Sequence, residues 1–245
     1  MIPKKIHYCW FGRKPLSELT LRCIESWKKY LPDYEIIQWN EGNFDVNLNM
    51  FTKEAYENKK FAFVSDVCRL YVLNQYGGIY LDTDMEIIKE LDIIDDNLIL
   101  GFEDMKYVNA GIMISPKNNI FIDRVYRCYE KKSFTADQNN LASISIPNLI
   151  TRELCELGLV LNNEFQIINN IKIYPSDYFY PFNYFTGKTQ NTKNSLTIHH
   201  YASSWLPKSR LMLNGLKYKL IFVFGENRVN KWIELWRSKQ NQNNN

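Results

Sequence analysis

The chain has 245 residues, of which 45% are hydrophobic, 23% charged and 15% aromatic. This composition excludes a disordered, collagen-like or disulfide-dominated chain and predicts one globular domain with a sizeable core. The formal charge of +3 is too small to indicate a nucleic-acid partner, so we expect none. That charge is unevenly spread, because residues 206–239 contain eight Lys and Arg against two Glu (+6), which leaves −3 for the remainder.

The five cysteines are odd in number, far apart and form no C-x-x-C pair. We therefore expect small buried hydrophobic residues in a reducing compartment. The first residues lack the long apolar stretch of a signal peptide, and no run reaches the ~18 apolar residues of a spanning helix. These features predict a cytoplasmic protein.

Short β-branched and aromatic runs alternate with helical patterns along the chain. Ser17 is placed to cap the first helix, Pro32 follows its end, and Gly77-Gly78 ends a helix that is apolar nearly all round. Strands are expected over 6–11, 34–39, 79–81, 98–102 and 110–114, and helices over 17–31, 63–76 and 120–131. This alternation predicts an α/β fold with mostly parallel strands, in which ligands bind where strands end.

Asp82 and Asp84 directly follow the apolar segment 77–81. In an extended segment both carboxylates would point to the same face, at one position just beyond the strand. Such oxygen ligands suit Mg²⁺ or Mn²⁺. The three residues alone favour an ordinary surface turn, whereas the apolar strand that leads into them favours a metal site.

Asp66 and Arg69 lie three residues apart on the apolar helix, and so roughly 60° apart around its axis. Buried charges must be paired or bound to a ligand. The two residues therefore either form a mutual ion pair or bind hydroxyl groups of a polar ligand. Their spacing is compatible with both roles.

Four segments carry a resemblance to a known family: IPKKIHYCWFG at 2–12, SDVCRLYVLNQYGGIYLDTD at 65–84, NAGIMIS at 109–115 and HHYASSW at 199–205. Together they resemble glycosyltransferase family 32, which includes yeast mannosyltransferases and bacterial polysaccharide enzymes and is similar in its core to the clostridial glucosylating toxins. The resemblance covers about residues 2–205.

The resemblance implies a GT-A fold with a mostly parallel mixed sheet over residues 1–205, a nucleotide-sugar donor, a divalent metal (Mn²⁺ or Mg²⁺) and retention of anomeric configuration. By position, Asp84 would ligate the metal, Asp82 would contact the ribose or the metal through water, and His199 would be a third ligand or a diphosphate contact, with His200 as the alternative to His199.

Further residues are placed at the donor by the same resemblance. Asp66, Arg69 and Asn109 would hold the donor sugar and act in catalysis with Asp84. The remaining donor contacts would be Trp10 at the nucleobase, Tyr80, Ala110 at the sugar, and Ser204 and Trp205 at the diphosphate. Taken without the family, Trp10 is equally a core aromatic and Asn109 a partner for backbone groups.

Two segments depart from the family pattern. Ile146-Pro147-Asn148 with Thr151 stands where relatives carry Gly-Pro before a Thr, which leaves the contacts of that loop open. Asp137-Gln138 resembles a donor-sugar motif of a related family, but a helix N-cap explains Asp137 equally well.

Residues 206–240 combine basic and aromatic side chains, and 241–245 form a polar tail that we expect to be disordered. A basic, aromatic helix suits an anionic membrane surface, where a lipid-linked acceptor would be located. The protein would then be peripheral on the inner face of the plasma membrane. The alternative is that this helix packs on the catalytic domain or in a dimer contact.

The sequence thus predicts a retaining, metal-dependent glycosyltransferase that moves a hexose from a nucleotide sugar, with UDP favoured, to an oligosaccharide or lipid-linked glycan in bacterial capsule or surface polysaccharide synthesis. A protein-modifying glucosyltransferase and a non-catalytic nucleotide-sugar-binding protein are the alternatives.

Overall fold

The computed structural model describes residues 1–134, 141–183 and 188–202, together with Arg228 and Lys231. The chain divides into two compact units, residues 1–181 with 191–200, and residues 182–190 with 201–245. Within the second unit, β9 (Phe182–Asn183) and β10 (Lys188–Thr189) pair in an antiparallel hairpin. The expected basic segment and polar tail lie outside the described residues, apart from Arg228 and Lys231.

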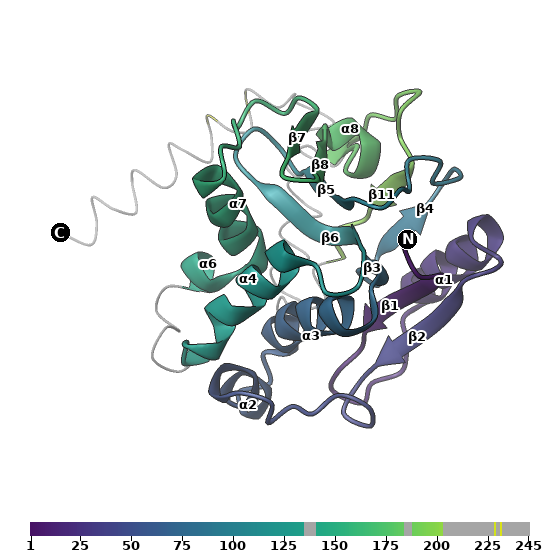
Figure 1. Ribbon diagram of the computed structural model, residues 1–245. Helices are drawn as coiled ribbons and strands as arrows, with labels where there is room; N and C mark the ends of the chain where they lie inside the picture. Colours follow the sequence, from purple (N-terminus) through teal and green to yellow (C-terminus); the bar gives the residue numbers. More distant parts are fainter. Residues whose placement is uncertain (135–140, 184–187, 203–227, 229–230, 232–245) are drawn as a thin grey trace. The chain divides into compact units, whose positions relative to one another are not determined.

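A seven-stranded sheet forms the centre of the first unit, in the order β2-β1-β3-β6-β5-β8-β7 (Figure 1). The strands are β1 (Lys5–Cys9), β2 (Glu35–Trp39), β3 (Gly78–Leu81), β5 (Leu98–Phe102), β6 (Val108–Ser115), β7 (Gln166–Ile168) and β8 (Ile171–Tyr174). Only β6 and β7 run against the other five. The predicted mostly parallel mixed sheet is therefore confirmed. A separate antiparallel ribbon pairs β4 (Met85–Ile87) with β11 (Thr197–His199).

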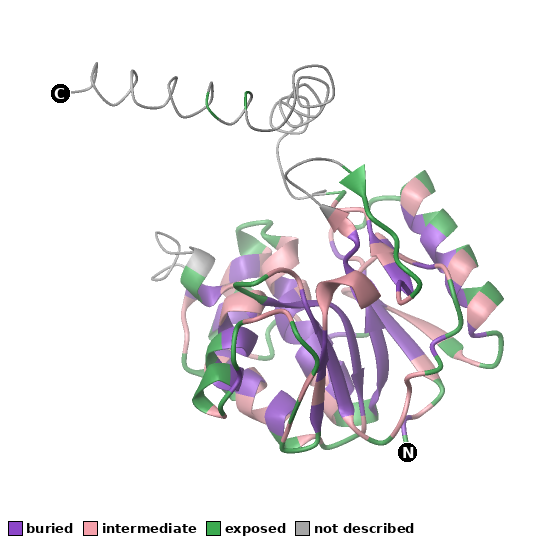
Figure 2. Cartoon of the chain, turned by 90° about the horizontal axis from the view of Figure 1, so that it is seen from above, coloured by how far each residue is buried: buried purple, intermediate pink, exposed green. Residues whose placement is uncertain are grey.

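Two hydrophobic cores lie on the opposite faces of this sheet, and the inner strands between them are mostly buried (Figure 2). Apolar residues of α1 and α8 belong to one core, and those of α2, α3, α4 and α7 to the other. The helices are α1 (Glu18–Tyr30), α2 (Met50–Glu57), α3 (Phe61–Tyr76), α4 (Ile120–Glu130), α6 (Leu141–Ile144), α7 (Ile146–Glu156) and α8 (Ser176–Phe179). Among the described residues, none of these helices is both long and apolar enough to span a membrane.

The elements expected in the first half of the chain are present with ends shifted by at most two residues. The predicted cap of α1 is confirmed, because Ser17 Oγ accepts a hydrogen bond from Thr20 N at 3.1 Å. The cysteine prediction is only partly right: Cys9, Cys23 and Cys68 are buried, Cys128 is half-buried and Cys155 is exposed.

Gly77 and Gly78 turn the chain from α3 directly into β3. Both have positive φ, +64° and +108°, which favours glycine. A Cβ on Gly77 would lie 2.6 Å from Lys117 N, and one on Gly78 would lie 2.6 Å from Lys5 O. Only glycine therefore permits this tight turn, which places the charged residues of α3 close to the end of β3.

The strand β6 is irregular where it passes the end of β3. Ile99 pairs with Ile114, but Gly101 pairs with Asn109, so two steps along β5 correspond to five along β6. The extra residues form a bulge, which re-aims the side chains and carbonyls around it. Within the bulge, Gly111 O accepts a hydrogen bond from Asp82 N at 2.8 Å. The bulge thus joins β6 to the acidic segment.

His7 is a fully buried histidine in β1. Trp39 Nε1 donates to its Nδ1 at 3.1 Å, so Nε2 carries the proton and donates to Gly77 O at 2.9 Å. Burial lowers the pKa of His7 to about 4, against the opposing effect of the Gly77 hydrogen bond. The ring is therefore neutral at pH 7 in the folded protein, and its hydrogen bond to Gly77 O fixes the α3–β3 turn.

A pH titration of stability tests the state of His7. Because its pKa falls from 6.5 on folding, its stabilising contribution is complete above pH 6.5 and is lost as the pH falls through about 4. We expect the free energy of unfolding of the wild type, from urea titrations, to fall relative to that of His7→Gln by up to about 1.4 kcal/mol per pH unit in this window. Parallel pH profiles would show that folding does not lower the pKa of His7.

Candidate active site

Asp82 and Asp84 lie in a turn, which corrects the expectation of an extended segment. The strand β3 ends at Leu81, and Met85 N donates to Asp82 O at 2.9 Å, which closes the turn. The chain then enters β4, whose partner β11 ends at His199. The two carboxylates are brought together by the turn and by the ribbon that follows it, instead of by the alternation of a strand.

Arg69 is the central residue of the charged cluster. It lies on α3, is only 6% exposed, and its Nη2 is 3.1 Å from Asp66 Oδ1 and 3.2 Å from Asp82 Oδ1. Its Nη1 donates to Ala110 O at 2.8 Å, and its Nε lies 3.4 Å from Ser65 O. Every nitrogen of the guanidinium group therefore has a protein partner.

Tyr80 completes the surroundings of Arg69 and Asp82. The guanidinium carbon of Arg69 lies 4.5 Å from the centre of the Tyr80 ring, a cation–π contact. The Tyr80 hydroxyl donates to Asp82 Oδ1 at 3.0 Å. Asp82 is thus oriented by two side chains that the family resemblance places at the donor.

The mutual ion pair left open for Asp66 and Arg69 is present, and it extends to Asp82. Burial raises the pKa of Asp66 to about 6, with the nearby Asp82 charge adding to the rise and Arg69 opposing it. Burial alone would lower the pKa of Arg69, but Asp82 and the other neighbouring acidic groups hold it well above its usual value. Arg69 therefore remains charged and compensates one of the two negative charges of Asp66 and Asp82.

Asp84 and His199 form the second charged group. His199 Nε2 lies 3.2 Å from Asp84 Oδ1, with 10% of the His199 side chain and 15% of the Asp84 side chain exposed. Burial lowers the pKa of His199, but Asp84 outweighs it, so the net shift is upward. The neighbouring His200 instead faces Glu86, with Nε2 to Oε2 at 2.7 Å, which supports the preference for His199.

One ligand atom from each of Asp82, Asp84 and His199 lies within 4.8 Å of the other two. Two carboxylates and an imidazole are a donor set that suits a divalent transition metal such as Mn²⁺. The three residues proposed as metal ligands from the sequence are thus brought together, and their chemistry fits the implied ion.

Asn109 and Ala110 lie in the β6 bulge beside this cluster. Asn109 is nearly buried, and its Oδ1 accepts from Gly111 N at 2.7 Å, which is the backbone role considered from the sequence. Its amide nitrogen is not engaged by any described residue. Ala110 contributes its carbonyl to Arg69.

Tyr180 is a site residue that the sequence did not indicate. This buried residue accepts a hydrogen bond from Ile112 N at 3.1 Å, and its ring meets that of His199 edge-on at 5.9 Å. It therefore links the β6 bulge to a predicted metal ligand. The contact arises from segments far apart in the chain, and the local pattern around Tyr180 carries no signal for it.

Trp10 lines an open hollow of about 400 Å³ at the ends of β1 and β2. Polar and charged residues, among them Arg13, Gln38 and Asn40, form the rest of its wall. The Trp10 indole donates to Lys14 O at 2.6 Å and the ring is half-buried. Trp10 is thus at the margin of the core and not within it.

Three predicted site residues, Ser204, Trp205 and Asp137, lie outside the described residues. The segment Ile146-Pro147-Asn148 with Thr151, expected as a loop, belongs to the helix α7. Ile146 N donates to Asp66 Oδ2 at 3.4 Å, and Thr151 Oγ1 accepts from Val108 N at 2.9 Å. The first turns of α7 thus contact Asp66 and β6.

Comparison with known proteins assigns a class to this arrangement. Residues 17–100 match the family described as "Glycosyltransferase sugar-binding region containing DXD motif". The solved structure of the PaToxG glycosyltransferase is similar in fold, with a TM-score of 0.54 and 20% identity over 63% of this chain and 69% of that one. The resemblance to the DXD glycosyltransferases and the GT-A fold are confirmed.

Two curated proteins extend the comparison. An uncharacterized glycosyltransferase of Acanthamoeba polyphaga mimivirus is 26% identical over 96% of this chain and 97% of its own length. "Subversion of eukaryotic traffic protein A" of Legionella pneumophila is 24% identical over 52% of this chain, which spans 23% of that protein's length. Residues 17–100, which contain Asp82-Thr83-Asp84, therefore resemble the sugar-binding region of DXD glycosyltransferases.

Replacement of Arg69 tests its role as the shared partner of two carboxylates. Arg69→Met removes the charge while keeping most of the volume, and leaves Asp66 and Asp82 close together and unpaired. We expect a loss of about 3–5 kcal/mol in the free energy of unfolding at pH 7, measured by urea denaturation. Arg69→Met with Asp66→Asn should lose less than the single variant, whereas equal losses would contradict the shared pairing.

Proposed function

We propose that the protein transfers a hexose from a nucleotide sugar, with UDP favoured, to a glycan acceptor with retention of anomeric configuration. The observation that carries this proposal is the approach of Asp82, Asp84 and His199 after β3, whose neighbour in the sheet, β1, leads to the hollow lined by Trp10. A cation site next to a hollow of this kind suits a nucleoside diphosphate, whose phosphates need a cation and whose base needs an aromatic surface.

In this proposal Asp84 and His199 hold the divalent metal, with Mn²⁺ preferred over Mg²⁺ because one donor is an imidazole. When bound, the metal would neutralise the charge that develops on the leaving diphosphate. Asp82 is held by Arg69 and Tyr80, and its position supports an indirect role through the ribose or a metal-bound water.

We assign the donor sugar to Asp66 and to the amide nitrogen of Asn109. Arg69 acts on the sugar site as a positioning residue, because its nitrogens are already bound to Asp66, Asp82 and backbone carbonyls. Ser204 and Trp205 are proposed diphosphate contacts on the resemblance alone. A lipid-linked acceptor, a role in capsule or surface polysaccharide synthesis and peripheral membrane binding of residues 206–240 belong to the same proposal.

Donor hydrolysis tests the metal assignment. We expect the wild type to hydrolyse at least one sugar donor from a panel of UDP- and GDP-sugars only when Mn²⁺ or Mg²⁺ is added. Asp84→Asn should reduce the rate by about 100-fold or more, because the ligand charge that fixes the metal is lost. Asp33→Asn, at an exposed position that lines neither the cluster nor a hollow, is the matched control. Full metal-independent activity in Asp84→Asn would contradict the assignment.

Nucleotide binding tests the assignment of Trp10. If the uracil ring stacks on the indole, Trp10→Ala should weaken UDP binding by about 5- to 150-fold, which corresponds to the 1–3 kcal/mol of a base–aromatic stack. Calorimetric titration with UDP and Mn²⁺ measures this, and Trp10→Phe should recover part of the affinity. Unchanged UDP affinity in Trp10→Ala would place the base elsewhere.

A further inference from the structure

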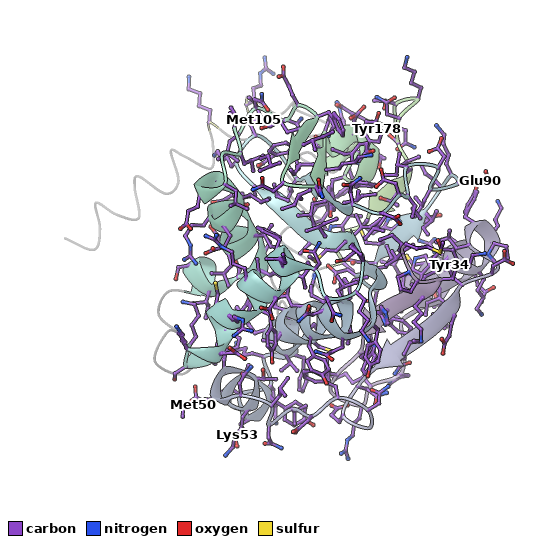
Figure 3. The ribbon with its side chains drawn as sticks, in the orientation of Figure 1. Tyr34, Met50, Lys53, Glu90, Met105 and Tyr178 are labelled. Carbon is purple, nitrogen blue, oxygen red and sulfur yellow. The ribbon has the colours of Figure 1, made fainter. Side chains whose placement is uncertain are left out.

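A second hollow, of about 580 Å³, lies apart from the Trp10 hollow and from the charged cluster. Residues of three segments line it: the end of α1, the loop after β4, and α8 with residues 193–196. In Figure 3, Glu90 marks the loop after β4 and Tyr178 marks α8, and both line this hollow. Its volume lies within the range of sites that bind small molecules or sugars.

Hydrogen bonds at Leu196 hold the walls of this hollow together. Leu196 O accepts from Ile88 N at 2.9 Å and from Lys89 N at 3.3 Å, and Leu196 N donates to Tyr178 O at 2.8 Å. Lys89 Nζ also donates to Lys193 O at 2.6 Å. The loop after β4, residues 193–196 and α8 are thus fixed to one another by hydrogen bonds, most of them to the buried Leu196.

The lining combines aromatic rings with polar groups of both signs. Tyr30 and Tyr178, from different helices, are each half-buried, while Lys89 and Asp92 are exposed on the rim. A half-buried tyrosine offers an apolar face and a hydroxyl, which match the C–H face and the hydroxyls of a sugar ring. Because the rim carries both charges in similar number, it favours a neutral, hydroxyl-rich ligand over an ion.

The ribbon β4–β11 connects this hollow to the charged cluster. Asp84 precedes β4 and His199 ends β11, whereas Ile88 and Leu196 stand at the opposite end of the same ribbon and line the hollow. Four residues of extended chain correspond to about 13 Å. Glu86, in the middle of β4, pairs with His200, which follows β11 beside Asp84, and both are half-exposed. A ligand that reaches both positions is therefore a chain and not a single sugar.

We propose that this hollow binds a neutral segment of the glycan acceptor, several sugar units away from the end that receives the transferred hexose. The inference rests on the proposed function, since it names the acceptor of that reaction as a chain and assigns its distal contact to Tyr30 and Tyr178.

Binding of neutral trisaccharides tests the proposal. Maltotriose, cellotriose, mannotriose and chitotriose are titrated into the full chain without donor or metal, with ligand-observed NMR as the readout. We expect at least one to bind the wild type and to bind Tyr178→Ala about tenfold more weakly. Asp92→Ala, on the exposed rim, should also weaken binding and avoids any loss of folding.

Tyr34→Ala is the matched control, because Tyr34 is half-buried to a similar degree but does not line the hollow (Figure 3). Its trisaccharide affinity should equal that of the wild type. The proposal is overturned if none of the four trisaccharides binds the wild type, or if Tyr178→Ala and Asp92→Ala bind as tightly as the wild type does.

Donor hydrolysis separates this proposal from the proposed function. Water replaces the acceptor in that reaction, so Tyr178→Ala should hydrolyse donor at the wild-type rate while losing trisaccharide binding. Absence of hydrolysis in the wild type, together with intact trisaccharide binding, would refute the transferase and leave the glycan site standing. Loss of hydrolysis in a folded Tyr178→Ala would overturn the separation between the two sites.

Discussion

The site depends on one buried guanidinium group. Arg69 lies on α3 between Asp66 of the same helix and Asp82 after β3, and also binds the carbonyl of Ala110 in β6. The buried carboxylate of Asp66 and the partly buried carboxylate of Asp82 would repel each other without a cation, and Arg69 forms an ion pair with both. The side chain of Arg69 therefore connects the helix α3, the turn at Asp82 and the bulged strand β6.

The two aspartates of the DXD motif have different partners. Asp82 has its charge compensated by Arg69 and one oxygen bound by Tyr80, whereas Asp84 faces the imidazole of His199. In the proposed reaction only the second aspartate offers its full charge to a metal ion. Tyr180 contacts both the β6 bulge and His199, and so holds His199 in place beside Asp84. These contacts fix the positions of Asp82 and Asp84 relative to each other.

Much of this could be predicted from sequence, because local patterns determine it. Ser17, the apolar positions of α3 and the Gly77-Gly78 turn specify their own elements, and the motifs of the family predict that Asp82, Asp84 and His199 lie close together. The rest depends on contacts between distant segments. The turn at Asp82 needs the neighbouring ribbon, the β6 bulge has no local signature, and Tyr180 approaches His199 from another part of the chain. The sequence left two roles open for Arg69, an ion pair with Asp66 or a contact to a polar ligand. Its ion pair with Asp82 could not be predicted, because only the tertiary structure brings the two residues together.

The central claim is that Asp84 and His199 bind the metal while Asp82 stays with Arg69. Diffraction at the manganese absorption edge, from crystals grown with Mn²⁺ and UDP, measures this directly. The account predicts one anomalous peak bonded to Asp84 and His199, with the ion pair between Asp82 and Arg69 intact. A peak bonded directly to Asp82 with that ion pair broken, or a peak remote from Asp84, would contradict it.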